Sequence, residues 1–309
     1  MTFRETSGSE INPLARIALS IDLEDFYHAN YPGYNYRTMA NSPSRLVEPT
    51  EMMLDIFDRH GHKVTFFVLG EVAKKFPELI RKIAGKGHEI ASHADNHTLI
   101  FEQGRDKSIH SIRNSVYFLE DLVGNKIYGF RAPNFSASPK RTPWLFDELA
   151  DLGLTYDSSR FPAKTYYGGE PGIPKIPFPM KLPNGDHLWE VPVSCLGPRG
   201  LRFAWSGGFY WRILPLSFIV KSVNKLLSHN KPVVLYLHPK DIDPHNPPLP
   251  IGKISNWIHQ VGTKRGFAKL DEMASQMQFS RIIDLLPEIN NGKEQQNKKR
   301  TVETETAVA

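Results

Sequence analysis

The chain has 309 residues, with 38 Lys or Arg against 33 Asp or Glu, so its formal net charge is +5. Hydrophobic residues make up 40% of it and charged residues 23%, which excludes a collagenous chain, a coiled coil and a wholly disordered protein. The length suits one large domain of the barrel or doubly wound kind, or two modest ones. A single cysteine, Cys195, excludes an internal disulfide and a cysteine-rich zinc module. Any metal site must therefore use histidine and carboxylate side chains.

The basic residues are spread along the chain, without an Arg/Lys-rich helix or a basic–aromatic motif, so we expect no nucleic-acid partner. Residues 1–15 lack an apolar core behind a basic start, and no apolar run approaches the ~18 residues of a membrane span. We therefore expect no integral membrane segment and a cytoplasmic location.

Short apolar strands alternate with amphipathic helices through the first half of the chain. The predicted strands are 17–23, 64–69, 88–92, 127–130 and 154–156, and the predicted helices are 49–60, 71–84, 108–123 and 143–152. This alternation predicts parallel strands joined by right-handed crossovers, hence an α/β fold with a closed or partly closed barrel. Ligands of such sheets gather at the carboxyl ends of the strands, so polar residues there are the first candidates for function.

The alternation stops after Arg160, where six prolines lie between positions 162 and 183. So many prolines exclude a helix or a central strand and predict an irregular insertion over about 160–210, with a hairpin arm at 187–193. The predicted elements then resume as a helix at 217–228, a strand at 233–237 and helices at 251–261 and 267–277. Residues 291–309 lack apolar periodicity and predict a disordered tail.

Two histidines follow the third predicted strand, in Ser92-His93-Ala94-Asp95-Asn96-His97. Imidazoles at positions i and i+4 can both reach one ion if the segment makes a helical turn. The spacing alone fits an ordinary surface pair equally well.

Two carboxylates end the first strand, in Ser20-Ile21-Asp22-Leu23-Glu24-Asp25. Asp22 and Glu24 face the same side because side chains alternate along a strand, and in a barrel mouth they would repel unless a cation or an arginine compensated them. Together with His93 and His97 they have the composition of a catalytic metal site, two imidazoles and one carboxylate with open positions for water and substrate. A solvated acidic loop is the alternative, and Asp25 fits that role.

Three further polar residues lie at other strand ends. Arg131 directly follows the strand 127–130, where it can pair with the spare carboxylate and keep it ionised; a surface charge is the alternative. His238 follows the most apolar strand and is either a core cap or a titrating acid at the barrel mouth. Asp157 either orients that histidine or caps the following turn.

In order along the chain, these motifs resemble the polysaccharide deacetylases that share the NodB homology domain, carbohydrate esterase family 4. Within that family the chain looks most like the branch found in bacterial exopolysaccharide and lipopolysaccharide loci. The resemblance covers about residues 15–285 as one catalytic domain, with the insertion inside it, and implies a distorted (β/α) barrel of about seven strands. It rests on five segments: Ser20–Asp25, His93–His97, Arg131–Ser136, Tyr156–Ser159 and Leu237–Asp241.

The first motif departs from the family's usual Thr-Phe-Asp-Asp, in which the first Asp is the base and the second a metal ligand. Aligned without a gap, Asp22 matches the base, but Leu23 stands in the ligand's place. The ligand role passes most naturally to Glu24 on the same strand face, with Asp25 as the rival if the strand bulges. The resemblance thus implies one divalent ion on His93, His97 and a carboxylate, zinc first and cobalt, nickel, manganese or iron as alternatives.

The implied activity is hydrolysis of an N-acetyl group on a saccharide. Asp22, held by Arg131, would take a proton from water, and His238, with Asp157 as its orienting partner, would protonate the leaving amine. Residues expected to contact the sugar are Tyr27, Pro133, Trp205 and Tyr210. Ordinary loop packing is the alternative role for the aromatic side chains among them.

Two other functions fit the same sequence. Relatives of this fold hydrolyse cyclic amides, as allantoinase does, some with altered metal motifs, and the departure at Leu23 makes that alternative less remote. The other alternative is a carbohydrate-binding module without a metal.

Overall fold

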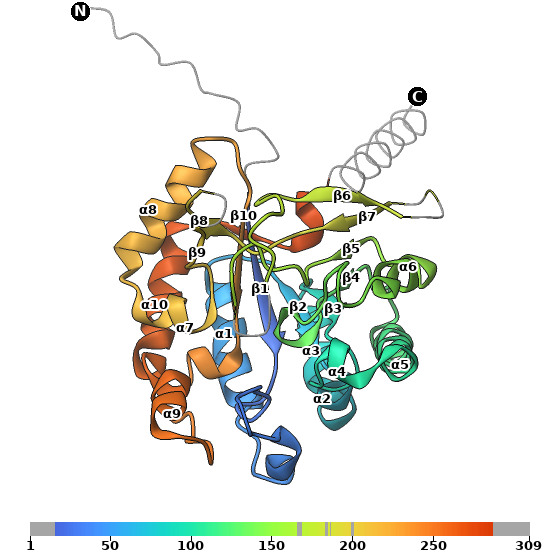
Figure 1. Cartoon of the computed structure of the whole chain (residues 1–309). Helices are drawn as coiled ribbons and strands as arrows, with labels where there is room; N and C mark the ends of the chain where they lie inside the picture. The colour runs from blue at the N-terminus through green and yellow to red at the C-terminus, as the bar shows by residue number, and fades with distance from the viewer. Residues whose placement is uncertain (1–15, 166–168, 183–184, 186, 199–200, 287–309) are drawn as a thin grey trace, which may run out of the picture.

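The computed structural model describes residues 16–165, 169–182, 185, 187–198 and 201–286, so the predicted tail at 291–309 lies outside the described residues. A curled sheet forms the centre of the molecule, with helices packed along its outer side (Figure 1). The strands are β1 (Ile17–Leu23), β2 (Thr65–Val68), β3 (Glu89–Ser92), β4 (Gly129–Phe130), β5 (Tyr156–Asp157), β6 (Phe178–Lys181), β7 (His187–Glu190), β8 (Cys195–Leu196), β9 (Phe203–Ala204), β10 (Val233–Leu237) and β11 (Phe279–Ser280).

Helices connect the parallel strands and close the chain. They are α1 (Val47–Arg59), α2 (Gly70–Lys75), α3 (Pro77–Gly85), α4 (Ile100–Gln103), α5 (Arg105–Val123), α6 (Trp144–Asp151), α7 (Gly208–Ile213), α8 (Leu216–Leu227), α9 (Lys253–Gln260) and α10 (Thr263–Gln276). Within the described part of the chain, no helix has both the length and the apolar character that a membrane crossing needs.

The strand order in the main sheet is β10-β1-β2-β3-β4-β5-β7-β6, with β11 beside β1. The seven strands from β10 to β7 run parallel, and only β6 pairs antiparallel, at the edge. This curled, mostly parallel arrangement confirms the predicted distorted (β/α) barrel. It also brings the carboxyl ends of seven strands to one side of the sheet.

Strand β1 shows how the barrel separates its apolar core from its polar mouth. Leu19, Ile21 and Leu23 pack outward against the helices, in the large core between sheet and helix layer. Ala18 points inward to a second apolar cluster that fills the base of the barrel. Asp22, two pleats further along the inward face, therefore lies buried at the mouth of the barrel.

Proline explains two differences from the predicted elements. The helix expected at 71–84 is two helices, α2 and α3, because Pro77 begins a new helix after Phe76, whose backbone angles (φ −131°, ψ 57°) are not helical. In the proline-rich segment, the expected hairpin arm forms β7, which pairs with β6 and also runs parallel to β5. Pro179 lies in β6 at the sheet edge, where a missing N–H costs no ladder hydrogen bond.

A glycine sets the position of α7 at the barrel mouth. The N–H of Tyr236 in β10 donates to the Ser206 carbonyl at 3.0 Å, and Gly207 bridges to Tyr236 in parallel. A Cβ at Gly207 would lie 2.1 Å from the Tyr236 carbonyl oxygen, so no side chain fits there. The chain thus runs beside β10 and enters α7 at the carboxyl end of the sheet.

Candidate active site

Three side chains from two strand ends meet at the barrel mouth. The Glu24 Oε1 atom lies 3.0 Å from Nε2 of His93 and 2.9 Å from Nε2 of His97. All three residues are buried, and their ligand atoms lie within 4.8 Å of one another. The sequence-predicted carboxylate and imidazole pair therefore converge on one point.

The protonation of this group fits a shared cation. The Nδ1–H of His93 donates to the Arg131 carbonyl at 2.7 Å, so in the neutral ring Nε2 carries a lone pair. Burial opposes the charge on Glu24, but the two imidazoles outweigh it and hold the pKa of that carboxyl well below its usual range. Burial also lowers the pKa of His97. An ionised carboxylate beside two imidazole nitrogens is a donor set that one cation would bind.

The spacing of the three ligand atoms fits a transition metal. Bonds of about 2.0–2.1 Å to zinc separate two ligands of a tetrahedral site by about 3.3 Å. The contacts of 2.9 and 3.0 Å from Glu24 to His97 and His93 differ from that spacing by a few tenths of an ångström. The described residues thus offer two nitrogen ligands and one oxygen ligand, the composition of a catalytic zinc site with an open position.

A second contact orients the His97 ring. Its Nδ1 lies 3.2 Å from the side-chain amide of Asn30, which lies in the loop after β1. A half-turn of that amide exchanges its oxygen and nitrogen, so Asn30 can accept the Nδ1 proton and leave Nε2 for an ion. A hydrogen bond of this kind usually orients a metal-binding histidine.

The histidine pair is presented by a bend and not by the helical turn that the spacing suggested. Ala94 has φ +67°, an unusual value for a residue with a side chain. Two N–H groups at the start of α2 hold the bend, from Gly70 to the Ala94 carbonyl at 2.9 Å and from Glu71 to the Asp95 carbonyl at 2.8 Å. A Cβ at Gly70 would lie 2.2 Å from Oδ1 and 3.0 Å from Cα of Asp95, so glycine permits this close approach without displacing Asp95.

Asp25, the rival ligand, is directed away from the histidines. Its carboxylate accepts the N–H groups of Phe26 at 2.9 Å and Arg45 at 3.0 Å, together with the Ser44 hydroxyl. These bonds join the loop after β1 to the start of α1. The geometry therefore favours Glu24 over Asp25 as the third ligand.

Asp22 and Arg131 form a fully buried ion pair at 2.6 Å. The guanidinium of Arg131 also donates to the Ser20 hydroxyl at 2.9 Å and to the hydroxyl and carbonyl of Ser158 at 2.9 and 3.2 Å. Its face lies 4.1 Å from the centre of the Phe67 ring. Since every side of the guanidinium is engaged, Asp22 is held by a rigid partner and keeps its second oxygen toward the cavity.

His238 faces Asp22 from the end of β10. Its Nε2 lies 3.9 Å from Asp22, and its Nδ1 lies 3.0 Å from Oδ2 of Asp241. Burial disfavours the charged imidazole, but the carboxylates of Asp241 and Glu24 outweigh burial and raise the pKa of His238. The ring is therefore placed and tuned to hold a proton near the cavity.

The prediction that Asp157 orients His238 is wrong. Asp157 ends β5, five strands away from β10 in the sheet order, and accepts the Ser159 hydroxyl in its own turn. Its other neighbour is Glu190 on β7, and burial followed by the charge of Asp157 raises the pKa of Glu190 well above its usual range. This buried acid pair can share a proton, while Asp241 takes the orienting role.

Asp241 is itself fixed by Arg212 from α7. The Nε atom of Arg212 lies 3.0 Å from Oδ1 of Asp241, and the rest of the guanidinium donates to carbonyls of Ile258, His259 and Val261. Burial opposes the charge on Asp241, yet His238 and Arg212 lower its pKa to about 2. An alternating row of charges thus runs from Arg131 through Asp22, His238 and Asp241 to Arg212.

Sequence reasoning missed Asp241 and Arg212 for different reasons. In His238-Pro239-Lys240-Asp241, a proline at the first helical position and an acid two residues later indicate a capped turn, and the Asp241 carboxylate does accept the His238 N–H at 2.8 Å. That local signal was present. Arg212 is separated from Asp241 by the helix α8 and the strand β10, so no spacing links them.

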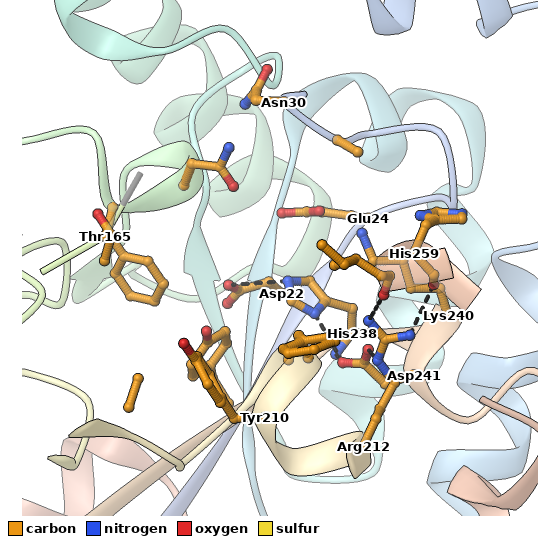
Figure 2. A pocket seen from close by; sticks show the side chains of 18 of the residues that line it. Asp22, Glu24, Asn30, Thr165, Tyr210, Arg212, His238, Lys240, Asp241 and His259 are labelled. Carbon is orange, nitrogen blue, oxygen red and sulfur yellow. Dashed lines mark hydrogen bonds and ion pairs between the residues drawn. The ribbon is translucent and has the colours of Figure 1, made fainter. Parts of the chain in front are cut away.

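A cavity of about 490 Å³ opens over this group. Figure 2 shows Asp22, Glu24 and His238 directed into its middle, with Tyr210 at its edge. The wall combines loop, strand and helix residues, among them Asn30, Tyr31, Phe135, Thr165, Tyr210 and Lys240. The space is sufficient for a sugar ring with its acetamido group.

Of the four predicted sugar contacts, only Tyr210 lines the cavity. Tyr27 is buried in a small apolar cluster of the loop after β1, and its carbonyl accepts the Tyr34 hydroxyl at 3.1 Å. Trp205 is fully buried in the main core. Pro133 is buried and does not line the cavity. Those three predictions are wrong because an aromatic or proline residue in a loop packs inward as readily as it faces a ligand.

Two family models divide the chain close to β5. Residues 38–156 match the model described as polysaccharide deacetylase, and residues 158–287 match a domain of unknown function, DUF3473. The Asp22–Glu24 and His238–Asp241 segments lie outside the first of these matches. The two halves of the candidate site are therefore covered unequally.

Two curated relatives resemble parts of the chain. One is a peptidoglycan-N-acetylglucosamine deacetylase of Bacillus cereus, 36% identical over 93 residues, or 30% of this chain and 32% of the relative. The other is a chitooligosaccharide deacetylase of Sinorhizobium fredii, 37% identical over 125 residues, or 38% of this chain and 53% of the relative. The matches thus span about a third and about half of these relatives.

Solved structures share the fold over most of the chain. A Mycobacterium smegmatis protein described as a polysaccharide deacetylase aligns with a TM-score of 0.62 at 20% identity, covering 90% of this chain and 91% of its own. PuuE allantoinase aligns with a TM-score of 0.58 at 14% identity, covering 87% and 88%. At these identities the likeness concerns the fold alone.

Proposed function

From the match of residues 38–156 to the polysaccharide deacetylase model, we propose that the chain is a metal-dependent hydrolase of this family that removes an N-acetyl group from a saccharide. The observation that carries the proposal is the convergence of Glu24, His93 and His97 beside the Asp22–Arg131 pair. The names of the two curated relatives make N-acetylglucosamine the first sugar to test.

Glu24, His93 and His97 would hold the divalent ion, zinc before cobalt, nickel, manganese or iron, because two imidazoles and one carboxylate suit these metals. A bound ion of this kind polarises an amide carbonyl and lowers the pKa of a bound water. The side-chain amide of Asn30 contacts Nδ1 of His97, and the carbonyl of Arg131 accepts the Nδ1–H of His93. These two contacts would fix both rings in the orientation that the ion requires.

Asp22 would be the general base. Its carboxylate points into the cavity on the side of Glu24, and the buried Arg131 guanidinium stabilises its charge and its position. A water between Asp22 and the acetyl carbonyl would lose its proton to Asp22 as it attacks. Asp22 would thus take the proton of the water from a position that Arg131 keeps fixed.

His238 would be the general acid. Amide hydrolysis expels an amine, which leaves readily only when it is protonated, so a proton donor is needed at the nitrogen. Asp241 raises the pKa of His238 and holds Nδ1, which leaves the Nε2 proton directed to the cavity. The 3.9 Å separation between Nε2 of His238 and the Asp22 carboxylate supports the proposal that the two act on one bond.

The test is elemental analysis of the purified protein followed by an acetate assay. The substrates are N-acetylglucosamine, its oligosaccharides and their N-acetylated analogues with other hexosamines, and allantoin is assayed separately for ring opening. We expect about one equivalent of a divalent transition metal and metal-dependent acetate release from at least one saccharide. Metal-free protein, or ring opening of allantoin without acetate release from any saccharide, would overturn the proposal.

A further inference from the structure

One side of the barrel carries most of the exposed apolar side chains of the described residues. Of the eleven large hydrophobic residues that are exposed in that part of the chain, seven lie between positions 201 and 257. They come from α7, α8, α9 and the segment that runs through β9, on the left side of the barrel in Figure 1. These seven residues, here called the apolar flank, are Leu201, Phe203, Tyr210, Ile213, Phe218, Ile254 and Trp257. Such a group marks an interaction surface when it is contiguous.

Contacts between aromatic rings join the elements of the apolar flank. The ring centre of Phe203 lies 6.5 Å from that of Phe218 and 5.2 Å from that of Tyr210. The half-buried Phe209 continues the row, because its ring centre lies 5.5 Å from that of Tyr210 and 6.1 Å from that of Trp257. The apolar flank is therefore contiguous from α8 to α9.

The segment that forms the apolar flank contains almost no acidic residues. Residues 191–270 include eleven Lys or Arg, about the frequency found elsewhere in the chain, but only two acids, Asp241 and Asp243, and both are buried. The remainder of the chain has 27 basic and 31 acidic residues, so the net positive charge of the protein comes from this segment. Glu272 of α10, just beyond it, lines a surface depression with Lys221 but forms no ion pair with it.

Three lysines lie beside the apolar flank on the same helices. Lys221 and Lys225 come three and seven residues after Phe218 in α8, so all three share one face of that helix. Lys253 comes one turn before Trp257 in α9. All three lysines are exposed, and among the residues that the structure describes no carboxylate pairs with them. The flank thus combines apolar side chains with positive charges that the protein leaves unpaired.

We propose that the apolar flank and its three lysines bind the surface of an anionic lipid bilayer. The aromatic and aliphatic side chains would enter the boundary between head groups and acyl chains, and the lysines would extend to the lipid phosphates. Phe209, Tyr210 and Ile258 belong to the wall of the cavity, so the cavity would open beside the lipid. The chain would lie on the bilayer without crossing it.

The charge and geometry of the flank favour lipid over two other occupants. A second copy that docked through the same surface would bring the lysines of both copies together, and like charges repel. A single-stranded nucleic acid stacks its bases on open aromatic faces. In the apolar flank neighbouring rings meet edge to face, at angles of 66–83°, and its two most exposed members are aliphatic, Leu201 at 80% and Ile254 at 78%.

The experiment measures the partition of the full-length protein into two kinds of vesicle, phosphatidylcholine alone and phosphatidylcholine with about one third phosphatidylglycerol. The apolar variant carries Ile254→Ser and Trp257→Ala, and the charge variant carries Lys221→Gln, Lys225→Gln and Lys253→Gln. The matched controls also replace exposed residues, on α5 and in the loops after α5 and before α6: Tyr117→Ala for the apolar variant, and Lys107→Gln, Lys126→Gln and Lys140→Gln together for the charge variant.

We expect the wild type to partition into the mixed vesicles at least about tenfold more strongly than into phosphatidylcholine, and less strongly as salt is added. Each lysine at an anionic surface contributes about a fivefold gain, so the charge variant should bind about a hundredfold more weakly. The apolar variant should bind about tenfold more weakly. Both controls should bind like the wild type.

Wild-type protein that does not bind the mixed vesicles would overturn the inference, as would equal weakening in the flank variants and their controls. A dimer in sedimentation velocity that both flank variants abolish would also overturn it, in favour of an interface between copies. Tighter binding to a single-stranded oligonucleotide than to the mixed vesicles would overturn it in favour of nucleic acid. The measurement needs no turnover, so its outcome is independent of whether the proposed deacetylation is found.

Discussion

The two halves of the barrel, residues 16–157 and 158–286, contribute different parts of the proposed chemistry. The first half holds the whole candidate metal site and the proposed base with its arginine, at the ends of β1, β3 and β4. The second half holds the acid His238 with Asp241 and Arg212, and much of the cavity wall. The first half would therefore activate the water and the acetyl group, while the second half would protonate the leaving amine and select the substrate.

Replacing His93 by Ala should have the largest effect of the proposed changes, a loss of bound metal. It would show that metal binding depends on the first half. One of three ligands is lost, so we expect the purified variant to retain less than about a tenth of the wild-type metal. His238→Asn in the other half should retain full metal content, because His238 lies outside the fully buried group of Glu24, His93 and His97 and belongs only to a second, partly exposed group with Asp22 and Glu24. Elemental analysis of both proteins makes the comparison, and equal metal content in the two variants would contradict the division.

Replacing Asp22 by Asn should cut kcat by a factor of about 10²–10⁴. The amide cannot take a proton from water, but it can still accept a hydrogen bond from Arg131, so the fold and the metal content should be preserved. Acetate release at saturating substrate, measured beside the metal content, gives the result. An activity near that of the wild type would make Asp22 a structural partner of Arg131 and move the base elsewhere.

Replacing Asp241 by Asn, in the second half, should change the dependence of kcat on pH. His238 acts when protonated, so the rate falls as the pH rises through its pKa, and the Asp241 carboxylate moves that fall to higher pH. In Asp241→Asn we expect kcat to drop about tenfold and the alkaline limb of kcat against pH to shift to lower pH. Asp157→Asn is the matched control, since Asp157 bonds Ser159 and Glu190 and the limb should stay in place. A limb that moves in the control and not in Asp241→Asn would restore Asp157 as the orienting residue.

The smallest expected effect is on stability. Low pH should lower the free energy of unfolding, because each half contains a histidine that is buried in its neutral form. Burial lowers the pKa of His88 to about 4 and that of His259 to about 3. Above pH 6.5 neither the folded nor the unfolded chain charges these rings; below it the unfolded chain binds protons first, so the free energy of unfolding falls as the pH falls. For His88 the loss between pH 6.5 and 4 is about 3 kcal/mol. Urea unfolding at pH 7 and pH 4.5 measures it, and His88→Asn, which can still accept the Val64 N–H, should show a smaller loss.

The first half was accessible to sequence reasoning because its determinants are periodic. Asp22 and Glu24 alternate with Leu23 along one strand, and Arg131 directly follows another, so the strand ends alone predict that they meet. What the pattern missed was how the chain turns between His93 and His97. The bend depends on α2 packing through Gly70, a contact between distant segments that has no local signature.

The second half was less accessible because its determinants are contacts between elements. Trp205 and Tyr210 are close in sequence and equally aromatic, yet one is fully buried and the other lines the cavity, since the extended segment at Gly207 pairs with Tyr236 and α7 begins directly after it. Arg212 reaches Asp241 across an intervening helix and strand. Only the local capped turn of His238 and Asp241 carried a sequence signal, through its proline and its acid.

The central claim is that Glu24, His93 and His97 share one divalent ion, and anomalous diffraction at the absorption edge of the metal found by elemental analysis tests it most directly. The account predicts a single strong anomalous peak bonded to the Glu24 carboxylate and to Nε2 of both histidines, at about 2.0–2.2 Å for zinc. A peak on Asp25 in place of Glu24, or a metal-loaded protein with no peak between the two histidines, would contradict it.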